Sequence, residues 1–330
     1  MPEPNTPPQP NNHYPNFDVI RILLAIEVVW AHIWEQLDPS NGWNGFIRAV
    51  PAFLAVSGFL VLKSYSETPL WRVFAIKRAL RIFPALLTAL AVGYAFFGYR
   101  FFVGSVYQWA TGGLISVSPN NGSLWSLAWE ELAYISLAVL WSLGAYKKPA
   151  YLWILLTTSY ALSLLVLSWH IAPRYYVISL LPLSFIIGNL MFIYRHHLDR
   201  LGSSAPWLCL VITCAWAYIP FPGTEPDMAP AILQAFSVVW VGVSGRRLVK
   251  IKFPDISYGL YVYNIPVIWF AVQFYDSNTP STWIFLLFGV FSISVASWYL
   301  IEKPSLKLKN RFDYRNKLAN KRDKARNYSS

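Results

Sequence analysis

Long apolar runs recur along almost the whole chain, from Phe17 to Ile301, and no polar stretch between them is long enough to form a separate soluble domain. Hydrophobic residues make up 55% of the sequence and charged residues only 13%. Soluble domains carry about 25% charged residues, so water cannot be the main solvent of this surface. We therefore predict an all-α protein embedded in lipid.

The apolar runs predict about ten transmembrane helices, because a helix needs about 20 mostly apolar residues to cross the hydrocarbon core. Most of the 27 Lys and Arg residues fall in every second loop and in the C-terminal tail. The positive-inside rule then places both termini in the cytoplasm. The predicted spans are residues 17–37, 45–65, 81–99, 123–145, 149–170, 176–194, 205–221, 229–246, 255–275 and 281–301.

Polar segments flank the predicted membrane domain at 17–302. Residues 1–16 are rich in Pro and Asn, and we expect a disordered, uncleaved cytoplasmic leader there. Residues 303–330 are basic and polar, and we expect a cytoplasmic tail that lies near anionic lipid headgroups. Membrane orientation explains the net charge of +11 better than nucleic-acid binding, because aromatic-basic motifs are lacking.

Motifs of several common enzyme classes are missing from the sequence. Cys209 and Cys214 lie on different faces of one predicted helix, and His196 and His197 lack a third ligand at a metal-binding spacing, so we expect neither a disulfide nor a metal site. The sequence has no nucleophile elbow, Walker loop, HExxH or dinucleotide fingerprint. Intramembrane acid–base chemistry and transport are the functions that this leaves.

The first predicted span contains several ionisable side chains, and each is a functional candidate because charge at membrane depth is costly. Arg21 and His32 are three turns apart, roughly 16 Å, and lie nearly on one face, with Asp18 in the same stripe. This arrangement favours a path that guides an anion toward a base. The alternative is that Asp18 pairs with Arg21 and that His32 only hydrogen-bonds a neighbouring helix.

Two further stretches carry charge into predicted spans. Arg78 and Arg81 share a helix face in KRALRIFPALL and are suited to clamp phosphates, although basic residues before a span are also ordinary orientation signals. Glu130 and Glu131 fall within the start of an apolar run. One of these carboxylates is expected to orient His32 or balance its charge, provided that the two helices meet.

These stretches, taken in order, resemble the acyltransferase-3 family of integral membrane acyltransferases. Arg21 and His32 match its arginine–histidine pattern, and Arg78 and Arg81 match its RxxR motif. PAFLAVSGFL at 51–60 and SLWSLAWEELAYI at 123–135 are similar to two of its helical segments, and SYGLYVYNIPVI at 257–268 and IEKPSLKL at 301–308 to its closing motifs. Asn264 departs from the pattern, because many members have histidine there; a hydrogen-bonding role survives this change.

The resemblance implies a multi-pass enzyme of the bacterial cytoplasmic membrane that moves an acyl group, by default acetyl, from cytoplasmic acyl-CoA to a hydroxyl of an extracytoplasmic glycan. Lipopolysaccharide O-antigen and exopolysaccharide are examples of such acceptors. It implies catalytic roles for His32 and Glu130 and donor binding by Arg21, Arg78 and Arg81. The implied supporting residues are Asp18, Ser57, Trp125, Ser126, Tyr134, Tyr261 and Asn264.

Several alternatives stay open at this point. Intramembrane charges also mark the pathways of transporters and flippases for polar molecules or glycan intermediates. A non-catalytic component of a polysaccharide-assembly machine would use the same charges for helix packing. If the chain is an acyltransferase, direct transfer and an acyl-histidine intermediate are both compatible with His32. A homo-oligomer or a partner in polysaccharide assembly is equally compatible with the sequence.

Overall fold

The structure is a computed structural model that describes residues 14–37, 45–169, 173–198, 202–216, 228–244, 248, 254–274 and 279–308. These residues form helices and no β-strand, which confirms the all-α prediction. Short η1 (Gly122–Leu124), η2 (Ala145–Lys147) and η4 (Trp298–Glu302), a π-helix, interrupt the α-helices. The α-helices are α1 (Asn16–Leu37), α2 (Ala49–Glu67), α3 (Trp71–Ala110), α4 (Trp125–Ser142), α5 (Pro149–Ser168), α6 (Pro173–Ile193), α7 (Arg195–Leu198), α8 (Ala205–Trp216), α9 (Met228–Ser244), α10 (Ser257–Val272) and α11 (Pro280–Ser297).

Every predicted span overlaps one of these α-helices, and α7, a single turn between α6 and α8, is the α-helix of the described residues that lies outside the predicted spans. By length and composition, four helices in the described part of the chain are apolar enough to cross a membrane: Ala49–Glu67, Trp71–Ala110, Pro149–Val166 and Ser281–Leu308. Shorter apolar helices cover α6, α8 and α9. The predicted leader up to residue 13, the predicted tail from residue 309 and most of the basic loop at 245–253 lie outside the described residues.

Large apolar side chains cover the outside of the helix bundle. On α5, Ile154 is 59% exposed and Leu162 is 57% exposed. Leu300 near the end of the chain reaches 76%. Many exposed apolar side chains of this kind are unfavourable in water and suit the hydrocarbon core of a bilayer, where the hydrogen bonds within the helices satisfy the backbone. The exposed surface therefore agrees with a protein that crosses the membrane several times.

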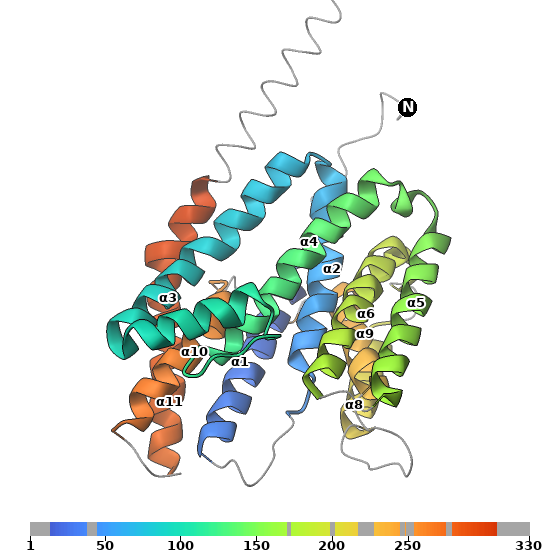
Figure 1. Ribbon diagram of the computed structural model, residues 1–330. Coiled ribbons are helices and arrows are strands. Elements are labelled where there is room, and N and C mark those ends of the chain that lie inside the picture. The colour runs from blue at the N-terminus through green and yellow to red at the C-terminus, as the bar shows by residue number, and fades with distance from the viewer. Residues whose placement is uncertain are drawn as a thin grey trace, which may run out of the picture.

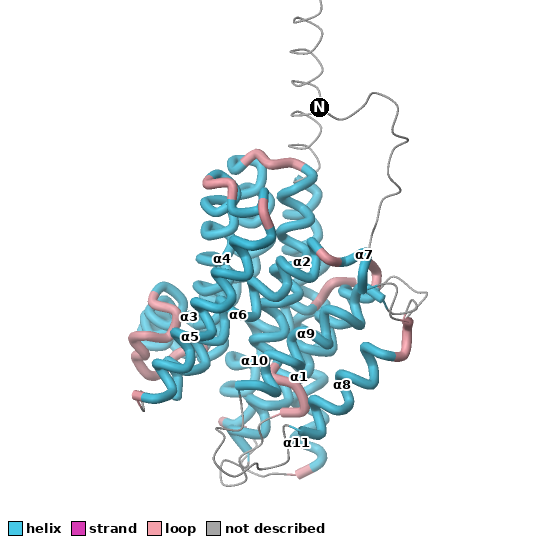
Figure 2. The backbone as a smooth tube through the Cα atoms, turned by 90° about the vertical axis from the view of Figure 1, so that its right-hand side faces the viewer, coloured by secondary structure: helices cyan, strands magenta, loops and turns pink. Residues whose placement is uncertain are grey.

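The long helices form two groups around α2 and α1 (Figure 1). In one group, α2 packs against α6 and α9, which α5 and α8 flank on the outside. In the other group, α1 packs against α10, and α10 packs against α11 and α3. α4 crosses in front of both groups in Figure 1 and contacts α2 and α3. Figure 2 shows the same bundle turned by 90°, so that the side on which α5 lies in Figure 1 faces the viewer.

The contact between α2 and α6 depends on two glycines. A Cβ added at Gly58 would lie 2.3 Å from the backbone oxygen of Phe185, and one added at Gly188 would lie 2.0 Å from the backbone oxygen of Ala55. The two helix backbones can come this close only because neither position has a side chain. Gly58 thus turns its face of α2 toward α6, while the adjacent Ser57 lines an internal cavity of the bundle.

We expect Gly188→Ala to destabilise the folded protein by about 1–3 kcal/mol, because the added methyl group meets backbone that cannot rotate away. Thermal unfolding of the purified protein in detergent, followed by size-exclusion chromatography, would measure the loss. Gly122→Ala is the matched control, since a Cβ there meets no atom within 4 Å. Equal stability of the two variants would contradict close packing of α2 on α6.

Helix α3 differs from the prediction of a span at 81–99. It starts earlier, at Trp71, and it is kinked at Gly98, whose φ of 78° lies in the left-handed region that favours glycine. After the kink the chain turns, and the second leg of α3 runs across the bundle (Figure 1). Because of the early start, Arg78 and Arg81 both lie within the first leg of the helix, where they reach the interior of the bundle.

Candidate active site

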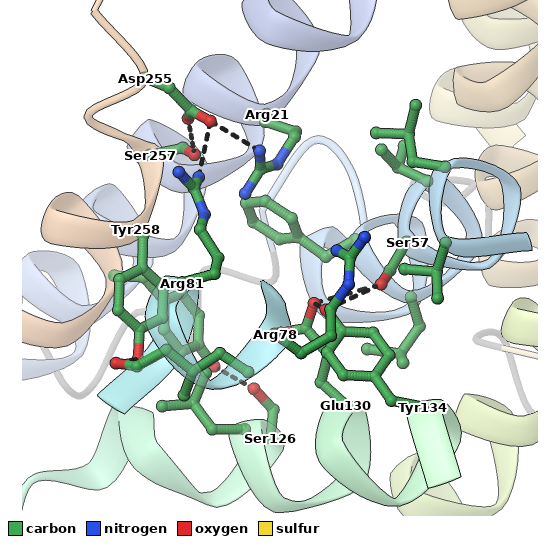
Figure 3. Close-up of a pocket in the computed structure, with 18 of the residues that line it drawn as sticks. Arg21, Ser57, Arg78, Arg81, Ser126, Glu130, Tyr134, Asp255, Ser257 and Tyr258 are labelled. Atoms are coloured by element: carbon green, nitrogen blue, oxygen red, sulfur yellow. Dashed lines mark hydrogen bonds and ion pairs between the residues drawn. The ribbon is translucent and has the colours of Figure 1, made fainter. Parts of the chain in front are cut away.

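A cavity of about 260 Å³ lies between the two helix groups and is lined by side chains from α1, α2, α3, α4 and α10 (Figure 3). Its charged lining comprises four basic side chains and two acidic ones. These are Arg21, Lys77, Arg78, Arg81, Glu130 and Asp255. Because the basic side chains outnumber the acidic ones, the cavity has the electrostatic character of an anion-binding site.

At one end of the cavity, a single carboxylate pairs with two guanidinium groups. Asp255 Oδ2 lies 2.7 Å from Arg21 Nη1 and 2.6 Å from Arg81 Nη2, and the Ser257 hydroxyl donates to Asp255 Oδ1 at 2.6 Å. Asp255 lies in the loop before α10. The two guanidinium groups favour the charged form of the Asp255 carboxyl.

A second polar group surrounds Glu130 on α4. The hydroxyl of Tyr134 donates to Glu130 Oε1, and Ser57 Oγ lies 3.2 Å from the same carboxylate oxygen and 3.3 Å from the Tyr134 hydroxyl. In Figure 3, Ser57, Glu130 and Tyr134 gather on the opposite side of the cavity from Asp255. The neighbouring Glu131 points elsewhere and accepts a hydrogen bond from the indole of Trp109. Of the two carboxylates, Glu130 is therefore the one at the cavity.

Arg78 is held differently from the other two arginines. Its guanidinium lies over the rings of Phe74 and Tyr134, with a carbon-to-centroid distance of 5.3 Å in each case. Within the described residues it makes no ion pair, and its buried Nε has no hydrogen-bond partner. A cation that is positioned by stacking but keeps its N–H donors available is suited to bind an oxyanion such as a phosphate.

His32 lies outside the cavity lining and has its own set of hydrogen bonds. Its Nδ1 is 3.0 Å from Asn264 Oδ1 and 3.4 Å from Ser123 Oγ, and Ser123 donates to the same Asn264 oxygen at 2.8 Å. Glu130 bonds to Ser57 and Tyr134, so among the described residues it makes no hydrogen bond to His32, and the balancing of the His32 charge by Glu130 stays a prediction. Asn264, for which the sequence left a hydrogen-bonding role without naming a partner, bonds to His32.

Two helices connect the cavity with His32. On α10, Tyr258 and Tyr261 line the cavity, and Asn264 follows Tyr261 by about one turn. On the α4 side, Ser126 lines the cavity and hydrogen-bonds the Tyr261 hydroxyl, and Ser123 precedes it by about one turn. His32 therefore lies about one helical turn beyond the inner end of the cavity, and Arg21 and Asp255 lie at the other end.

The structure thus brings together most of the side chains that the sequence singled out. The lining includes Arg21, Ser57, Arg78, Arg81, Ser126, Glu130, Tyr134 and Tyr261. Among the described residues, Asp18 and Trp125 do not line the cavity, so the expectation that Asp18 lies along the path is not met; Trp125 packs against the main hydrophobic cluster. The sequence reasoning missed Asp255 and Ser123. An acidic residue at the very start of a predicted span was the available signal for Asp255.

These features define the class: a polytopic membrane protein with an internal, basic polar cavity and a histidine beyond its inner end. Residues 14–301 match the acyltransferase-3 family profile, described as an acyltransferase domain. The match covers most of the chain, so the protein belongs to this family and is a membrane acyltransferase.

Two curated relatives extend over nearly the same length. "Nodulation protein 10" of Rhizobium leguminosarum bv. viciae is 26% identical, over 91% of this chain and 95% of its own length. An "O-acetyl transferase" of Shigella phage Sf6 is 27% identical, over 88% of this chain and 95% of its own length. No solved structure shows significant similarity to the chain.

Proposed function

We propose that this protein transfers an acetyl group from cytoplasmic acetyl-CoA to a hydroxyl of an extracytoplasmic glycan. The observation that carries the proposal is the arrangement of an internal cavity with a basic end, and of His32 about one turn beyond its other end. Such an arrangement suits a donor that is anionic at one end and reactive at the other. The phage relative named as an O-acetyl transferase supports acetyl as the acyl group.

The proposal includes ten spans with both termini in the cytoplasm of a bacterial inner membrane. Its support is that Arg21, near the start of α1, and Leu306, near the end of the last described helix, line the same cavity. Arg21 and Asp255 lie close to the starts of α1 and α10, so the basic end of the cavity faces that side. The positive-inside rule assigns that side to the cytoplasm, where acyl-CoA is found.

In the proposed reaction, the phosphates of the donor bind at Arg78 and Arg81, with Arg21 beside them. The acyl thioester extends along the cavity toward His32. Nε2 of His32 removes the proton of the acceptor hydroxyl as its oxygen attacks the thioester carbonyl carbon. The carbon–sulfur bond then breaks, and the CoA thiolate takes the proton from the imidazolium. The products are the glycan ester and CoA thiol, and no acyl-histidine intermediate is formed.

The proposed acceptor follows from the position of His32 relative to the cavity. An extracytoplasmic glycan, such as lipopolysaccharide O-antigen or an exopolysaccharide, fits an enzyme whose base lies beyond the inner end of a cavity that opens toward the cytoplasm. The glycan hydroxyl would then approach His32 from the extracytoplasmic side, and the two substrates would meet inside the bundle.

Membranes with and without the protein, supplied with acetyl-CoA labelled in the acetyl group, would test the function. We expect label in the envelope glycan that mild alkali releases, as it releases O-esters but not amides. If label is transferred from a longer acyl-CoA but not from acetyl-CoA, the donor is the longer acyl-CoA and the proposal of acetyl transfer is wrong. Absence of protein-dependent label with every donor would refute the proposal.

Arg78→Gln should raise the KM for acetyl-CoA roughly tenfold or more and leave kcat nearly unchanged, because a phosphate contact binds the ground state and the transition state alike. Initial rates at varied donor concentration measure both constants. Arg72→Gln is the matched control: Arg72 lies on the same helix, is exposed and does not line the cavity. An unchanged donor KM in Arg78→Gln, or an equal rise in Arg72→Gln, would contradict donor binding at Arg78.

A further inference from the structure

The asparagine beside His32 has an orientation that its hydrogen bonds determine. Asn264 is fully buried, and its Nδ2 donates to the backbone oxygens of Leu260 at 3.1 Å and Tyr261 at 2.7 Å. If the amide were reversed, its oxygen would face two carbonyl oxygens with no proton between them. The observed orientation is therefore required, and Asn264 Oδ1 must face His32 and Ser123.

The position of Asn264 Oδ1 has a direct consequence for the imidazole. An amide oxygen is only an acceptor, so the contact of 3.0 Å with His32 Nδ1 is a hydrogen bond only if Nδ1 carries the proton. The Ser123 hydroxyl already donates its proton to the same oxygen, so it does not supply one to Nδ1. In the neutral ring, the proton on Nδ1 leaves Nε2 with a lone pair. Within the described residues, Nε2 has no hydrogen-bond partner.

The part of α10 that carries Asn264 is hydrogen-bonded to the turn that carries Ser123. Pro266 has no N–H, so the carbonyl of Val262, four residues earlier, lacks its usual helical donor. The side chain of Asn121 donates to this carbonyl at 2.9 Å, and Asn121 Oδ1 accepts from the backbone N–H of Ser123. The proline thus leaves a carbonyl free to accept from Asn121, and this hydrogen bond links the turn that carries Ser123 to the part of α10 that carries Asn264.

We propose that Asn264, assisted by Ser123, is the positioning residue that fixes the Nδ1–H tautomer of His32 and directs Nε2 as the base toward the acceptor hydroxyl. The proposal rests on the proposed function for the role of His32, but the tautomer itself follows from the hydrogen bonds alone. Because an amide does not titrate near neutral pH, the partner of His32 remains a neutral acceptor throughout the physiological range.

Nitrogen NMR of the protein in lipid, labelled in its five histidines, tests the tautomer without any activity assay. Protonated and unprotonated ring nitrogens resonate far apart, and coupling to the ring carbons distinguishes Nδ1 from Nε2. The signal that disappears in His32→Gln assigns the residue. We expect the neutral ring to carry its proton on Nδ1. A proton on Nε2 would overturn the proposal, whether or not the protein transfers acetyl groups.

The kinetic test uses Asn264→Leu, which keeps a similar volume but removes the acceptor oxygen. We expect kcat to fall roughly 100-fold, with the donor KM within about twofold of wild type, because the base is misdirected while the donor site is intact. The Nδ1–H signal should also give way to a mixture of tautomers. Asn189→Leu is the matched control, since Asn189 is a buried asparagine of α6 (1% exposed) outside the cavity lining.

The outcomes separate the proposal from the proposed function. A normal kcat in Asn264→Leu would overturn the positioning role even if acetyl transfer by the wild type is established. If the wild type transfers no acyl group, the proposed function fails, and the NMR result still decides the tautomer. If Asn264→Leu does not fold, the NMR spectrum of the wild-type protein still shows which ring nitrogen of His32 carries the proton.

Discussion

His32→Ala should reduce acetyl transfer by roughly 10²- to 10⁴-fold, because loss of a positioned general base removes a contribution of that size from the rate. The donor KM should change little, since His32 lies about one turn beyond the cavity lining and does not contact the arginines. Turnover of purified protein in lipid, at saturating acetyl-CoA, is the measurement.

His197→Ala is the control for this experiment. His197 is exposed and lies in the single turn α7, where it contacts Tyr194. This variant should retain its turnover. Equal elution volumes in size-exclusion chromatography would show that both variants are folded. Near-normal turnover of a folded His32→Ala protein would remove the catalytic assignment, although the acyltransferase family membership would stand.

The second large effect concerns stability. Asp255→Ala should lower the free energy of unfolding by about 3–5 kcal/mol, because it leaves the guanidinium groups of Arg21 and Arg81 without their shared counter-ion. Their side chains are only 24% and 15% exposed, so water cannot replace the carboxylate well. Thermal unfolding in detergent and the yield of folded protein in membranes would both report the loss.

A surface ion pair of the same length provides the comparison. Lys63 Nζ and Glu67 Oε1 are also 2.7 Å apart, but Glu67 is 61% exposed. Glu67→Ala should therefore change stability by less than about 1 kcal/mol. If Asp255→Ala were as stable as Glu67→Ala, the buried pairs would be solvated in the membrane-embedded protein, and the electrostatic account of this end of the cavity would be wrong.

Much of the fold could be predicted from the chain because apolar length is a strong signal. Each long helix overlaps one predicted span, and most of the errors lie at the ends of the helices. The kink at Gly98 was missed for a physical reason: a positive φ leaves no trace in hydrophobicity, and Arg100 just beyond it was interpreted as the end of a span. The early start of α3 was missed because Arg72, Lys77 and Arg78 lower the local hydropathy although the segment is helical.

The candidate site was predicted in its composition but not in its contacts. Side chains such as Arg78 and Glu130 were identified because charge in an apolar run is costly, and the cavity does gather them. The partner of His32 was not predictable, because the rotation of α10 relative to α1 depends on packing along the entire bundle. Asp255 was missed because its position, at the start of a predicted span, resembles an ordinary interfacial charge.

The hydrogen bond from Asn121 to the Val262 carbonyl, which lacks a helical donor because of Pro266, also affects how this sequence can evolve. Replacing Pro266 alone would restore a backbone N–H as a second donor to the Val262 carbonyl, whose oxygen has two lone pairs. Replacing Asn121 alone would leave the Val262 carbonyl without a donor inside the bundle. Loss of Asn121 is therefore costly while proline occupies position 266 and less costly once a residue with an N–H has replaced it, so the residue at 266 determines which residues position 121 can accept.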